Sequence, residues 1–513
     1  MSSSEVHKPY IEPALLRFFF WTCSIFLSAC AIVQIVQSLD WPLFGDAPLM
    51  HYPAWLISQG AIPYRDIFDQ QFPGLYLLHL CIIKFLGPGD FAWRMADLLS
   101  LLFINIGIFS FLKKSGTLPA LLAVSLFSCY HLNGLPFHAA QRDFFMLMFF
   151  TLGTFCTASS LERSFALTRL FFGGLLLGAV TMIKPHAALY LLMMASVIGG
   201  CAVRQKQPLV RPLAVFFISA TIVPAGILTW LALNGGLLPL IDIVFNYLIP
   251  LYATMEHPST GIYDFLFKYS VLYVPIVSEA ACLVLITLAA FIMQKRLQLQ
   301  TVIAVLGLTY GIIHFISQGR AWYYHLYPLV LFMILLVATW LPSYEAAKKS
   351  RIYIVVMAVM IQLVFGIGMK SVANIAKNTR YDLHYSVFQL QDDMRSRLKP
   401  GDKVQLFDST GLGVHVLYIL KVPIASRFMM DMHLFHPRDD ADYIKKIRAE
   451  LIATLKKEPP KLIVVSIVSY IGERSFNRIK KFPELCSLLD RSYKLAIERD
   501  LYRIYELKSN SNQ

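Results

Sequence analysis

Charged residues are scarce in this chain of 513 residues. Asp, Glu, Lys and Arg together make up 15% of it, against about 25% in an ordinary soluble domain. Hydrophobic residues make up 57%, and the mean hydropathy is +0.57. This balance excludes an ordinary soluble enzyme and indicates a membrane protein. The formal charge of +14 fits attraction to anionic lipid and does not argue for binding to nucleic acid.

The cysteines provide no disulfide framework. Of the eight, seven lie in or beside apolar segments, where Cys behaves as a small hydrophobe. Only Cys486 lies in the polar C-terminal part, which therefore cannot form an internal disulfide. The chain also lacks a P-loop, a Gly-rich dinucleotide fingerprint and the Cys/His spacing of a zinc site. The usual sequence signals of nucleotide chemistry are thus missing.

Long apolar runs dominate the first 370 positions, and a span takes roughly 17 to 25 residues. Eleven such runs lie at about 15–37, 91–112, 117–134, 143–160, 168–184, 187–203, 212–233, 271–293, 300–317, 325–342 and 352–369. No small-residue cleavage site follows the first run, so we expect a retained span. A shorter apolar stretch at 73–87 is expected to lie along the membrane interface.

Lys and Arg in the short loops predict the orientation of the spans. With the N-terminus inside, the predicted inner loops hold fourteen of these residues, and the outer side of residues 1–369 holds seven. Acids run the other way, with four inside and eight outside. An odd number of spans then places the C-terminal part on the outer, extracytoplasmic side.

Composition divides the chain into a membrane domain, residues 1–369, and a soluble domain, residues 370–513. In the second part, KVQLFDS (403–409) and KLIVVSIV (461–468) are typical of buried strands, and residues 440–457 are typical of an amphipathic helix. LYRIYEL (501–507) alternates like an edge strand. The predicted fold class is therefore an α-helical polytopic membrane protein with a C-terminal soluble α/β domain.

The segment Trp41–Gly74 places acids among aromatics and prolines directly after the first apolar run. It carries Asp46, Asp66 and Asp69. Carboxylates close to a bilayer are costly to desolvate, which favours a functional role for them. The alternatives are structural. Asp46 would cap a helix that begins near Pro48, and the other two acids would stabilise a turn in PYRDIFD.

Further short motifs follow in order along the chain. They are AWLISQGAIPYRD (54–66), FPGLYLLHLCIIKFLG (72–87), AWRMADLLS (92–100), QRDFFMLMF (141–149), GAVTMIKPHAALY (178–190) and QGRAWYYHLYPL (318–329). With Asp46 ahead of them, these motifs resemble the polytopic glycosyltransferases of the C superfamily (GT-C). The resemblance is to the bacterial branch with the lipopolysaccharide core glycosyltransferases, the aminoarabinose transferase and the protein O-mannosyltransferases. It covers about residues 10–370 and departs at Ala47, where the family often has a second acid.

Members of this family take a sugar from a polyprenyl-phosphate donor and pass it to an acceptor with inversion. The resemblance therefore implies a bacterial inner-membrane enzyme that acts at the outer face on a cell-envelope lipid, glycan or protein. It also implies a divalent cation, Mg²⁺ or Mn²⁺, with Asp46 as a ligand. Two other functions stay open. A transporter or flippase of lipid-linked saccharides would carry ionisable groups near the middle of its spans, such as Glu279. An inactive family member would act as a binding module.

Transfer chemistry requires a carboxylate that takes the proton of the acceptor hydroxyl. Asp46 is the candidate for this base, or for base and metal ligand together, and Asp66 or Asp69 is the candidate for a second acid. The charged candidates lie on the side away from cytosolic nucleotides, which argues against a nucleotide-sugar donor.

The leaving phosphate needs positive charge to stabilise it. Arg142, Lys184 and His325 are the candidates for binding the donor phosphate. The alternative for the two span-end cations is snorkelling to the interface, and for His325 it is an interface residue among aromatics. Arg94 and Asp97 are expected to form a structural i,i+3 pair that orients the site.

Aromatic faces favour the oxocarbenium-like transition state of glycosyl transfer. Tyr52, Tyr64, Trp322 and Tyr323, with Tyr324, are the candidates for stacking on the sugar or the isoprenoid. The alternative for each of them is a place in an interfacial aromatic belt.

Overall fold

A computed structural model describes residues 13–162, 165–255, 274–294, 298–318, 322–341, 351–381, 385–467 and 475–508. The first residues of the predicted span 271–293 and residues 319–321 of the QGRAWYYHLYPL motif lie outside the described residues. So do several basic residues of the predicted inner loops, such as Lys295 and Lys348.

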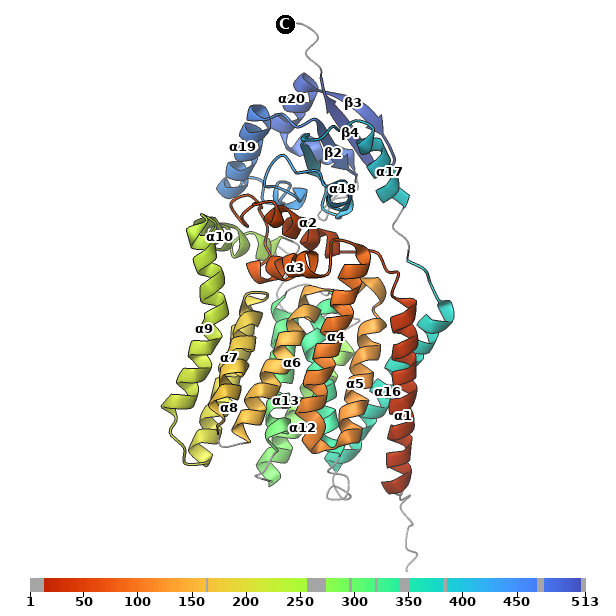
Figure 1. The fold of residues 1–513 in the computed structure, drawn as a ribbon, viewed down its shortest axis with the longest axis vertical. Coiled ribbons are helices and arrows are strands. Elements are labelled where there is room, and N and C mark those ends of the chain that lie inside the picture. Colours follow the sequence, from red (N-terminus) through yellow and green to blue (C-terminus); the bar gives the residue numbers. More distant parts are fainter. Residues whose placement is uncertain are drawn as a thin grey trace, which may run out of the picture.

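Each of the eleven predicted spans coincides with a helix of one bundle (Figure 1). The helices are α1 (Pro13–Gln37), α4 (Asp90–Leu112), α5 (Thr117–Leu132), α6 (Arg142–Leu161), α7 (Leu167–Thr181), α8 (Ala188–Arg204), α9 (Val210–Leu233), α12 (Val274–Gln294), α13 (Leu299–Ser317), α14 (Tyr327–Trp340) and α16 (Arg351–Lys377). Among the described residues, eight helices are long and apolar enough to cross a membrane by length and composition. The apolar parts of α5, α7 and α12 are shorter than the 18 residues that this criterion requires. The chain is a polytopic α-helical membrane protein.

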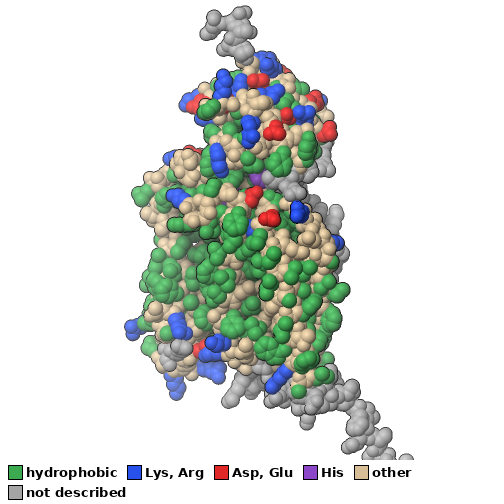
Figure 2. Space-filling view, turned by 45° about the vertical axis from the view of Figure 1, so that its right-hand side comes forward, with side chains coloured by type: hydrophobic (Ala, Val, Ile, Leu, Met, Phe, Trp, Pro, Cys, Tyr) green, Lys and Arg blue, Asp and Glu red, His purple; other side chains and the backbone are tan. Residues whose placement is uncertain are grey.

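Small residues let neighbouring helices of the bundle pack closely. A Cβ atom on Gly174 of α7 would lie 2.2 Å from the Phe216 carbonyl oxygen of α9. A Cβ on Gly178, one turn further, would lie 2.0 Å from the Ala220 carbonyl oxygen. This Gly-x-x-x-Gly spacing brings the two backbones together, as is common where no water drives helix association. The outer surface of the bundle is largely apolar (Figure 2).

Short helices cover one end of the bundle. Helices α2 (Ala47–Ser58) and α3 (Pro73–Phe85) lie across this end and not along the bundle axis (Figure 1). Helix α10 (Leu237–Ile243) and the π-helical turn η4 (Val244–Leu248) follow α9 at the same end. The remaining single turns are η1 (Lys113–Ser115), η2 (Leu135–Phe137), η3 (Pro185–Ala187), η5 (Tyr252–Thr254) and η7 (Tyr323–Leu326).

The C-terminal part forms a small α/β layer above this end. Its strands are β1 (Val404–Phe407), β2 (Leu462–Ser466), β3 (Tyr493–Glu498) and β4 (Tyr502–Leu507), in the order β1-β2-β4-β3. Strands β1 and β2 are parallel, and both other pairs are antiparallel. Its helices and turns are α17 (Tyr385–Arg395), α18 (Leu412–Leu420), η9 (Asp431–His433), α19 (Asp442–Lys457), η10 (Phe476–Lys481) and α20 (Pro483–Ser492).

The strand at 501–507 exists, but its predicted place at the sheet edge is wrong. Strand β4 pairs with β2 on one side and β3 on the other. Its alternation reflects one buried face, carried by Tyr502 and Ile504, and not a free edge. Strand β3, which was not predicted, takes the edge position.

Hydrogen bonds fasten the α/β layer to the end of the bundle. The Phe68 N–H donates to the Arg427 carbonyl across 2.7 Å, and Arg427 Nη1 donates to the Tyr64 carbonyl across 3.0 Å. Tyr418 Oη donates to the Pro88 carbonyl across 2.5 Å. These contacts hold the layer directly over α2, α3 and the space beneath them.

Candidate functional site

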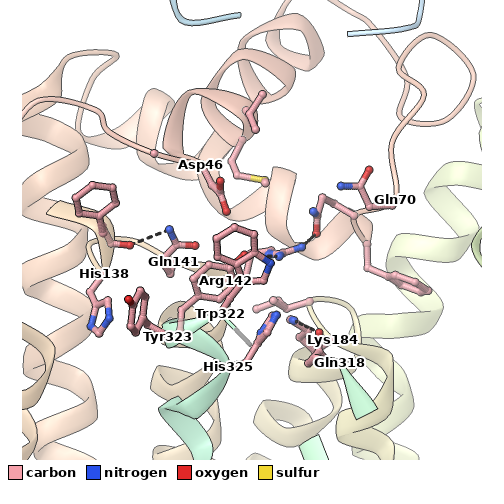
Figure 3. A pocket seen from close by; sticks show the side chains of 18 of the residues that line it. Asp46, Gln70, His138, Gln141, Arg142, Lys184, Gln318, Trp322, Tyr323 and His325 are labelled. Atoms are coloured by element: carbon pink, nitrogen blue, oxygen red, sulfur yellow. Dashed lines mark hydrogen bonds between the residues drawn. The ribbon is translucent and has the colours of Figure 1, made fainter. Parts of the chain in front are cut away.

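A cavity of about 1180 Å³ lies between the bundle end, the helices that cover it and the α/β layer. Its polar and aromatic lining comes from both parts of the chain and comprises Asp46, Gln70, Gln71, Phe72, Asn133, Phe137, His138, Gln141, Arg142, Lys184, His186, Tyr252, Ser317, Gln318, Trp322, Tyr323, Tyr324, His325, Lys370, Asn374 and Ser409. Met430 and Met432 of the α/β layer also line it. Segments far apart in the sequence thus enclose one space (Figure 3).

Asp46 is the acid that faces this cavity (Figure 3). Asp46 is the residue immediately before α2, but its side chain makes no capping hydrogen bond. The capping alternative therefore does not account for its carboxylate. The Asp46 carboxylate lies close enough to the Arg142 guanidinium for the two charges to attract each other.

The structure does not bring Asp66 or Asp69 to the cavity. The Asp66 carboxylate pairs with Arg65 at 2.8 Å and accepts from the Ile62 N–H. Burial opposes its ionisation, but these contacts outweigh burial and lower the pKa of Asp66. Both acids stabilise the loop that joins α2 to α3, as the structural alternative predicts.

Asp69 is buried within that loop. Its Oδ1 accepts from the Gln70 N–H at 2.6 Å and the Gln71 N–H at 3.3 Å, and Tyr76 Oη donates to Oδ2. Burial nevertheless raises the pKa of Asp69 to about 6. The adjacent Gln70 and Gln71 reach the cavity in its place.

Arg142 begins α6 and is held in the cavity wall. Its Nη1 donates to Gln71 Oε1, and its Nη2 donates to Tyr324 Oη at 3.4 Å. Its guanidinium carbon also lies 5.7 Å from the centre of the Tyr324 ring. The Nε atom is buried and has no hydrogen-bond partner among the described residues. A side chain held in this way is a pre-positioned cation and not a mobile snorkelling group.

Lys184 lines the cavity and is 6% exposed. Its Nζ lies 3.3 Å from Asp143 Oδ2 and donates to Gln318 Oε1 at 3.1 Å. Lys184 precedes the turn η3, which Pro185 begins. Snorkelling would carry the ammonium to water, whereas here it points to a buried carboxylate.

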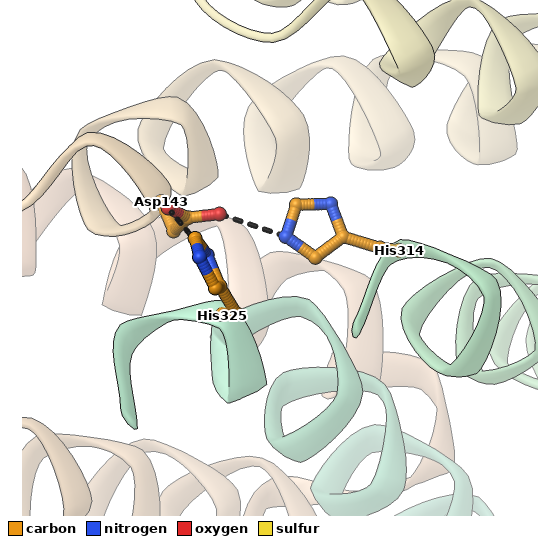
Figure 4. A group of neighbouring side chains, drawn as sticks. All are labelled: Asp143, His314 and His325. Carbon is orange, nitrogen blue, oxygen red and sulfur yellow. Dashed lines mark hydrogen bonds and ion pairs between the residues drawn. The ribbon is translucent and has the colours of Figure 1, made fainter. Parts of the chain in front are cut away.

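A network of three His residues surrounds the same carboxylate. His314 Nε2 lies 2.7 Å from Asp143 Oδ1, and its Nδ1 lies 2.7 Å from His186 Nε2. A carboxylate only accepts, so His314 donates from Nε2 to Asp143. His325 Nδ1 lies 3.4 Å from Asp143 Oδ2, near enough for an ion pair but without a hydrogen bond (Figure 4).

Asp143, His314 and His325 form a group that can hold a metal ion, since their ligand atoms lie within 4.8 Å of one another. One carboxylate with two imidazoles suits zinc or iron better than magnesium. Asp143 Oδ2 and His325 Nδ1 are buried without hydrogen-bond partners in the described part of the chain. Both atoms thus have lone pairs available, although a cation bound there would displace Lys184 from Oδ2. The residues fit a metal by type and proximity.

The predicted Mg²⁺ or Mn²⁺ ligand Asp46 does not fit as well. Among the described residues that line the cavity, Asp46 is the one acid. Magnesium is bound by several oxygen ligands, usually with one or two carboxylates. A guanidinium near Asp46 further opposes a second positive charge there.

The aromatic candidates divide into two sets. Trp322 and Tyr323 line the cavity and are 40% and 57% exposed, and Trp322 stacks on Tyr324 at 6.3 Å between ring centres. Tyr52 and Tyr64 are buried elsewhere. Tyr52 Oη donates to the Val422 carbonyl at 2.9 Å, and Tyr64 Oη donates to the Gln71 carbonyl at 2.7 Å. Those two rings pack in the interface with the α/β layer and offer no face to the cavity.

The predicted pair of Arg94 and Asp97 is confirmed as a fully buried ion pair. Asp97 also accepts from the Ala140 N–H at 2.6 Å and lies 3.0 Å from His131 Nε2. Ala140 has φ of +52°, a strained conformation for a residue with a Cβ. The buried Asp97 therefore holds the turn that leads into Arg142.

Sequence analysis missed Asp143 and His314. Asp143 lies beside the chosen Arg142, and His314 lies within the apolar run 300–317. The available sequence signal was the position of an ionisable residue within a predicted span, because such residues often have a function. Glu279 was singled out on that ground, and the same reasoning applies to Asp143 and His314.

No protein-family model and no curated protein matches the chain. Solved structures do match it. ArnT from Cupriavidus metallidurans bound to undecaprenyl phosphate has a TM-score of 0.57 and 9% identity, over 95% of this chain and 98% of that chain. The apo oligosaccharyltransferase of Archaeoglobus fulgidus has a TM-score of 0.50 and 12% identity, over 86% and 69%. Both are GT-C glycosyltransferases, so the chain has the GT-C fold that the motifs predicted.

Proposed function

We propose that this chain is an inverting glycosyltransferase. It moves a sugar from a polyprenyl-phosphate donor to a cell-envelope lipid, glycan or protein at the outer face of a bacterial inner membrane. One observation carries the proposal: a single cavity joins the carboxylate of Asp46 to the cations of Arg142 and Lys184. The shared fold with ArnT, whose structure contains undecaprenyl phosphate, supports the donor class.

The roles follow from the charges in the cavity. Asp46 takes the proton of the acceptor hydroxyl, because it is the acid that faces the space and its side chain is not engaged in capping. Arg142 and Lys184 stabilise the phosphate as it leaves. His325 adjoins them through Asp143.

Other side chains orient the reacting groups. Asp143 and Gln318 fix the ammonium of Lys184. Trp322 and Tyr323 present aromatic faces for the sugar or the first isoprene units. A metal bound by Asp143, His314 and His325 would supply further positive charge for the leaving phosphate.

The transporter alternative is less well supported. Glu279 of α12, the acid expected within a span, accepts from Gln362 Nε2 at 2.7 Å and does not line the described cavity. Asp46, Arg142 and Lys184 lie where helices begin or end, next to the short helices α2 and α3. This arrangement suits chemistry at an interface and not passage through the bundle.

A deletion strain tests the proposal. Mass analysis of envelope lipids, glycans and proteins should show one sugar missing, restored by the wild-type gene and not by Asp46→Asn. Restoration by Asp46→Asn would favour a binding module. Accumulation of a lipid-linked saccharide on the inner leaflet, with transfer still intact in broken membranes, would favour a flippase.

A further inference from the structure

The cavity has a second cationic end that the roles above do not use. Lys370 and Asn374 of α16 line it there, together with His138 after η2. His138 and Lys184 lie on opposite sides of Asp46 in the close view (Figure 3). Asp46, the proposed base, therefore lies between two sets of polar side chains. The set with Arg142 and Lys184 is assigned to the phosphate of the sugar donor, and the set with Lys370 and His138 has no role yet.

Lys370 stands out among the cations of the cavity. It lies seven residues before the end of α16 at Lys377, which places it about 10 Å deeper along the helix. The structure gives its ammonium no hydrogen bond or ion pair with any described residue. Lys370 is exposed and lines the cavity, so its ammonium is accessible to a ligand there.

The position of Lys370 is fixed by its helix neighbours. Ser371 Oγ donates to Asn133 Oδ1 at 3.0 Å, and Asn374 Nδ2 lies 3.4 Å from the same oxygen. Asn133 in turn donates to the Ile367 carbonyl at 2.9 Å. These bonds fasten α16 to the end of α5, so the cavity wall beside Lys370 is pre-organised.

His138 supplies a second polar group without a partner. It is 8% exposed, and its Nδ1 is buried without a hydrogen-bond partner among the described residues. Its ring packs against Gly134, where a Cβ would lie 1.7 Å from the imidazole. The buried Nδ1 faces Gly134, where a Cβ would lie 1.9 Å from it, so Nε2 on the other side of the ring is the atom available to a ligand in the cavity.

We infer that Lys370 and His138 bind an anionic group, a phosphate or a carboxylate, on the acceptor. This rests on the proposed function. No acid besides Asp46 lines the described cavity, so nothing there neutralises Lys370 internally. An acceptor anchored at this end presents its hydroxyl to Asp46, while Arg142 and Lys184 hold the donor phosphate at the other. The acceptor class is thus an anionic lipid or saccharide, not a neutral one.

Binding to the purified protein in phosphatidylcholine nanodiscs tests this. The probes are lysophosphatidic acid against monoacylglycerol, and glucose 6-phosphate against glucose. Lys370→Gln should weaken binding of an anionic probe about 10- to 100-fold, as loss of a charge-assisted bond does. Lys370→Arg should stay within a few-fold of wild type. Lys377→Gln is the matched control, since Lys377 ends the same helix and lines a separate, smaller pocket.

The outcomes separate the sources of the anion. Loss for lysophosphatidic acid indicates a lipid-borne group, and loss for glucose 6-phosphate alone indicates a soluble saccharide. Equal binding by wild type and Lys370→Gln, or equal losses in Lys370→Gln and Lys377→Gln, would overturn the inference. Undecaprenyl phosphate is titrated in parallel. If undecaprenyl phosphate does not bind the wild-type protein, the proposed donor is wrong. The anionic probes would still measure the contribution of Lys370.

Discussion

The Asp143 carboxylate on α6 accepts a hydrogen bond from His314 Nε2 on α13 across 2.7 Å. Its other oxygen lies 3.3 Å from Lys184 Nζ. One buried acid therefore sets both the tautomer of an imidazole and the place of an ammonium. Lys184 depends on Asp143 for its charge balance, because it has little access to water.

Removing only the charge of Asp143 should destabilise the protein more than removing the charges of Asp143 and Lys184 together. Asp143→Asn leaves the Lys184 ammonium buried without its counter-charge, which should lower the free energy of unfolding by about 3 to 5 kcal/mol. The double variant Asp143→Asn/Lys184→Met should recover most of that loss, since both charges are gone. Unfolding of the three proteins in one detergent measures the difference. A double variant as unstable as the single one would show that the two charges are not coupled.

Asp46→Asn should abolish transfer while leaving the fold intact. Asn keeps the shape of the side chain but takes no proton, and loss of a positioned base slows reactions roughly a hundredfold to ten-thousandfold. No capping hydrogen bond is lost, because Asp46 makes none. The measurement is single-turnover transfer by purified protein, with melting temperature as the control. Near-normal turnover would remove Asp46 from the chemistry.

Because of Asp69, the free energy of unfolding should be higher at acidic pH than at neutral pH. Its pKa is raised to about 6 by burial, above the value near 4 of an exposed Asp. Between these pH values the folded state binds more protons than the unfolded state, so stability falls as pH rises from 4 to 6. The change amounts to at most about 3 kcal/mol. Above pH 6 this contribution stays at its low value.

The matched comparison is wild type against Asp69→Asn, which keeps the loop geometry but cannot titrate. The difference in unfolding free energy between the two should shrink by that amount as pH rises from 4 to 6. Parallel pH profiles for the two proteins would contradict the shifted pKa.

The spans could be predicted because each helix of the bundle carries its own long apolar run, so local hydropathy suffices. The same holds for β1 and β2, which are continuous apolar strands. Strand β4 was misplaced because alternation reports a buried face and says nothing about a neighbour such as β3. Pairing partners depend on the whole sheet.

The site could be predicted only in part, because its chemistry is assembled by contacts between distant segments. Asp143 and His314 are 171 residues apart in sequence, and no local pattern indicates that they meet. Asp46, Arg142 and Lys184, which line the cavity, could be proposed from the sequence because motifs mark them. Asp66 shares the same motif region as Asp46 but points away, since Arg65 and the Ile62 N–H satisfy its carboxylate.

The C-terminal domain should lie on the outer side of the membrane. Basic residues gather where α4 and α8 end and where α7 and α9 begin, at the bundle end away from the α/β layer (Figures 1 and 2). Positive loops are retained inside, so this end should face the cytoplasm. A reporter fused after Gln513 should be active outside only. Activity in the cytosol alone would place the cavity on the wrong side for a polyprenyl-linked donor at the outer face.

The last prediction separates phosphate binding from interfacial snorkelling at Arg142 and Lys184. If both cations hold the donor phosphate, Arg142→Gln and Lys184→Gln should each weaken binding of undecaprenyl phosphate about 10- to 100-fold, which corresponds to roughly 1.5 to 3 kcal/mol. Snorkelling needs only a positive head, so Lys184→Arg would then be silent. A position shaped for one ammonium between Asp143 and Gln318 should instead accept the planar guanidinium poorly.

The experiment compares undecaprenyl phosphate affinity and single-turnover rate for wild type and the three variants in nanodiscs. Lys114→Gln is the matched control, because Lys114 pairs with Glu162 at the opposite end of the bundle and lies outside the cavity. Donor binding should fall in Arg142→Gln and Lys184→Gln and hold in Lys114→Gln. If all four variants bind like wild type, the phosphate is held elsewhere, and the group of Asp143, His314 and His325 becomes the next candidate through a bound metal.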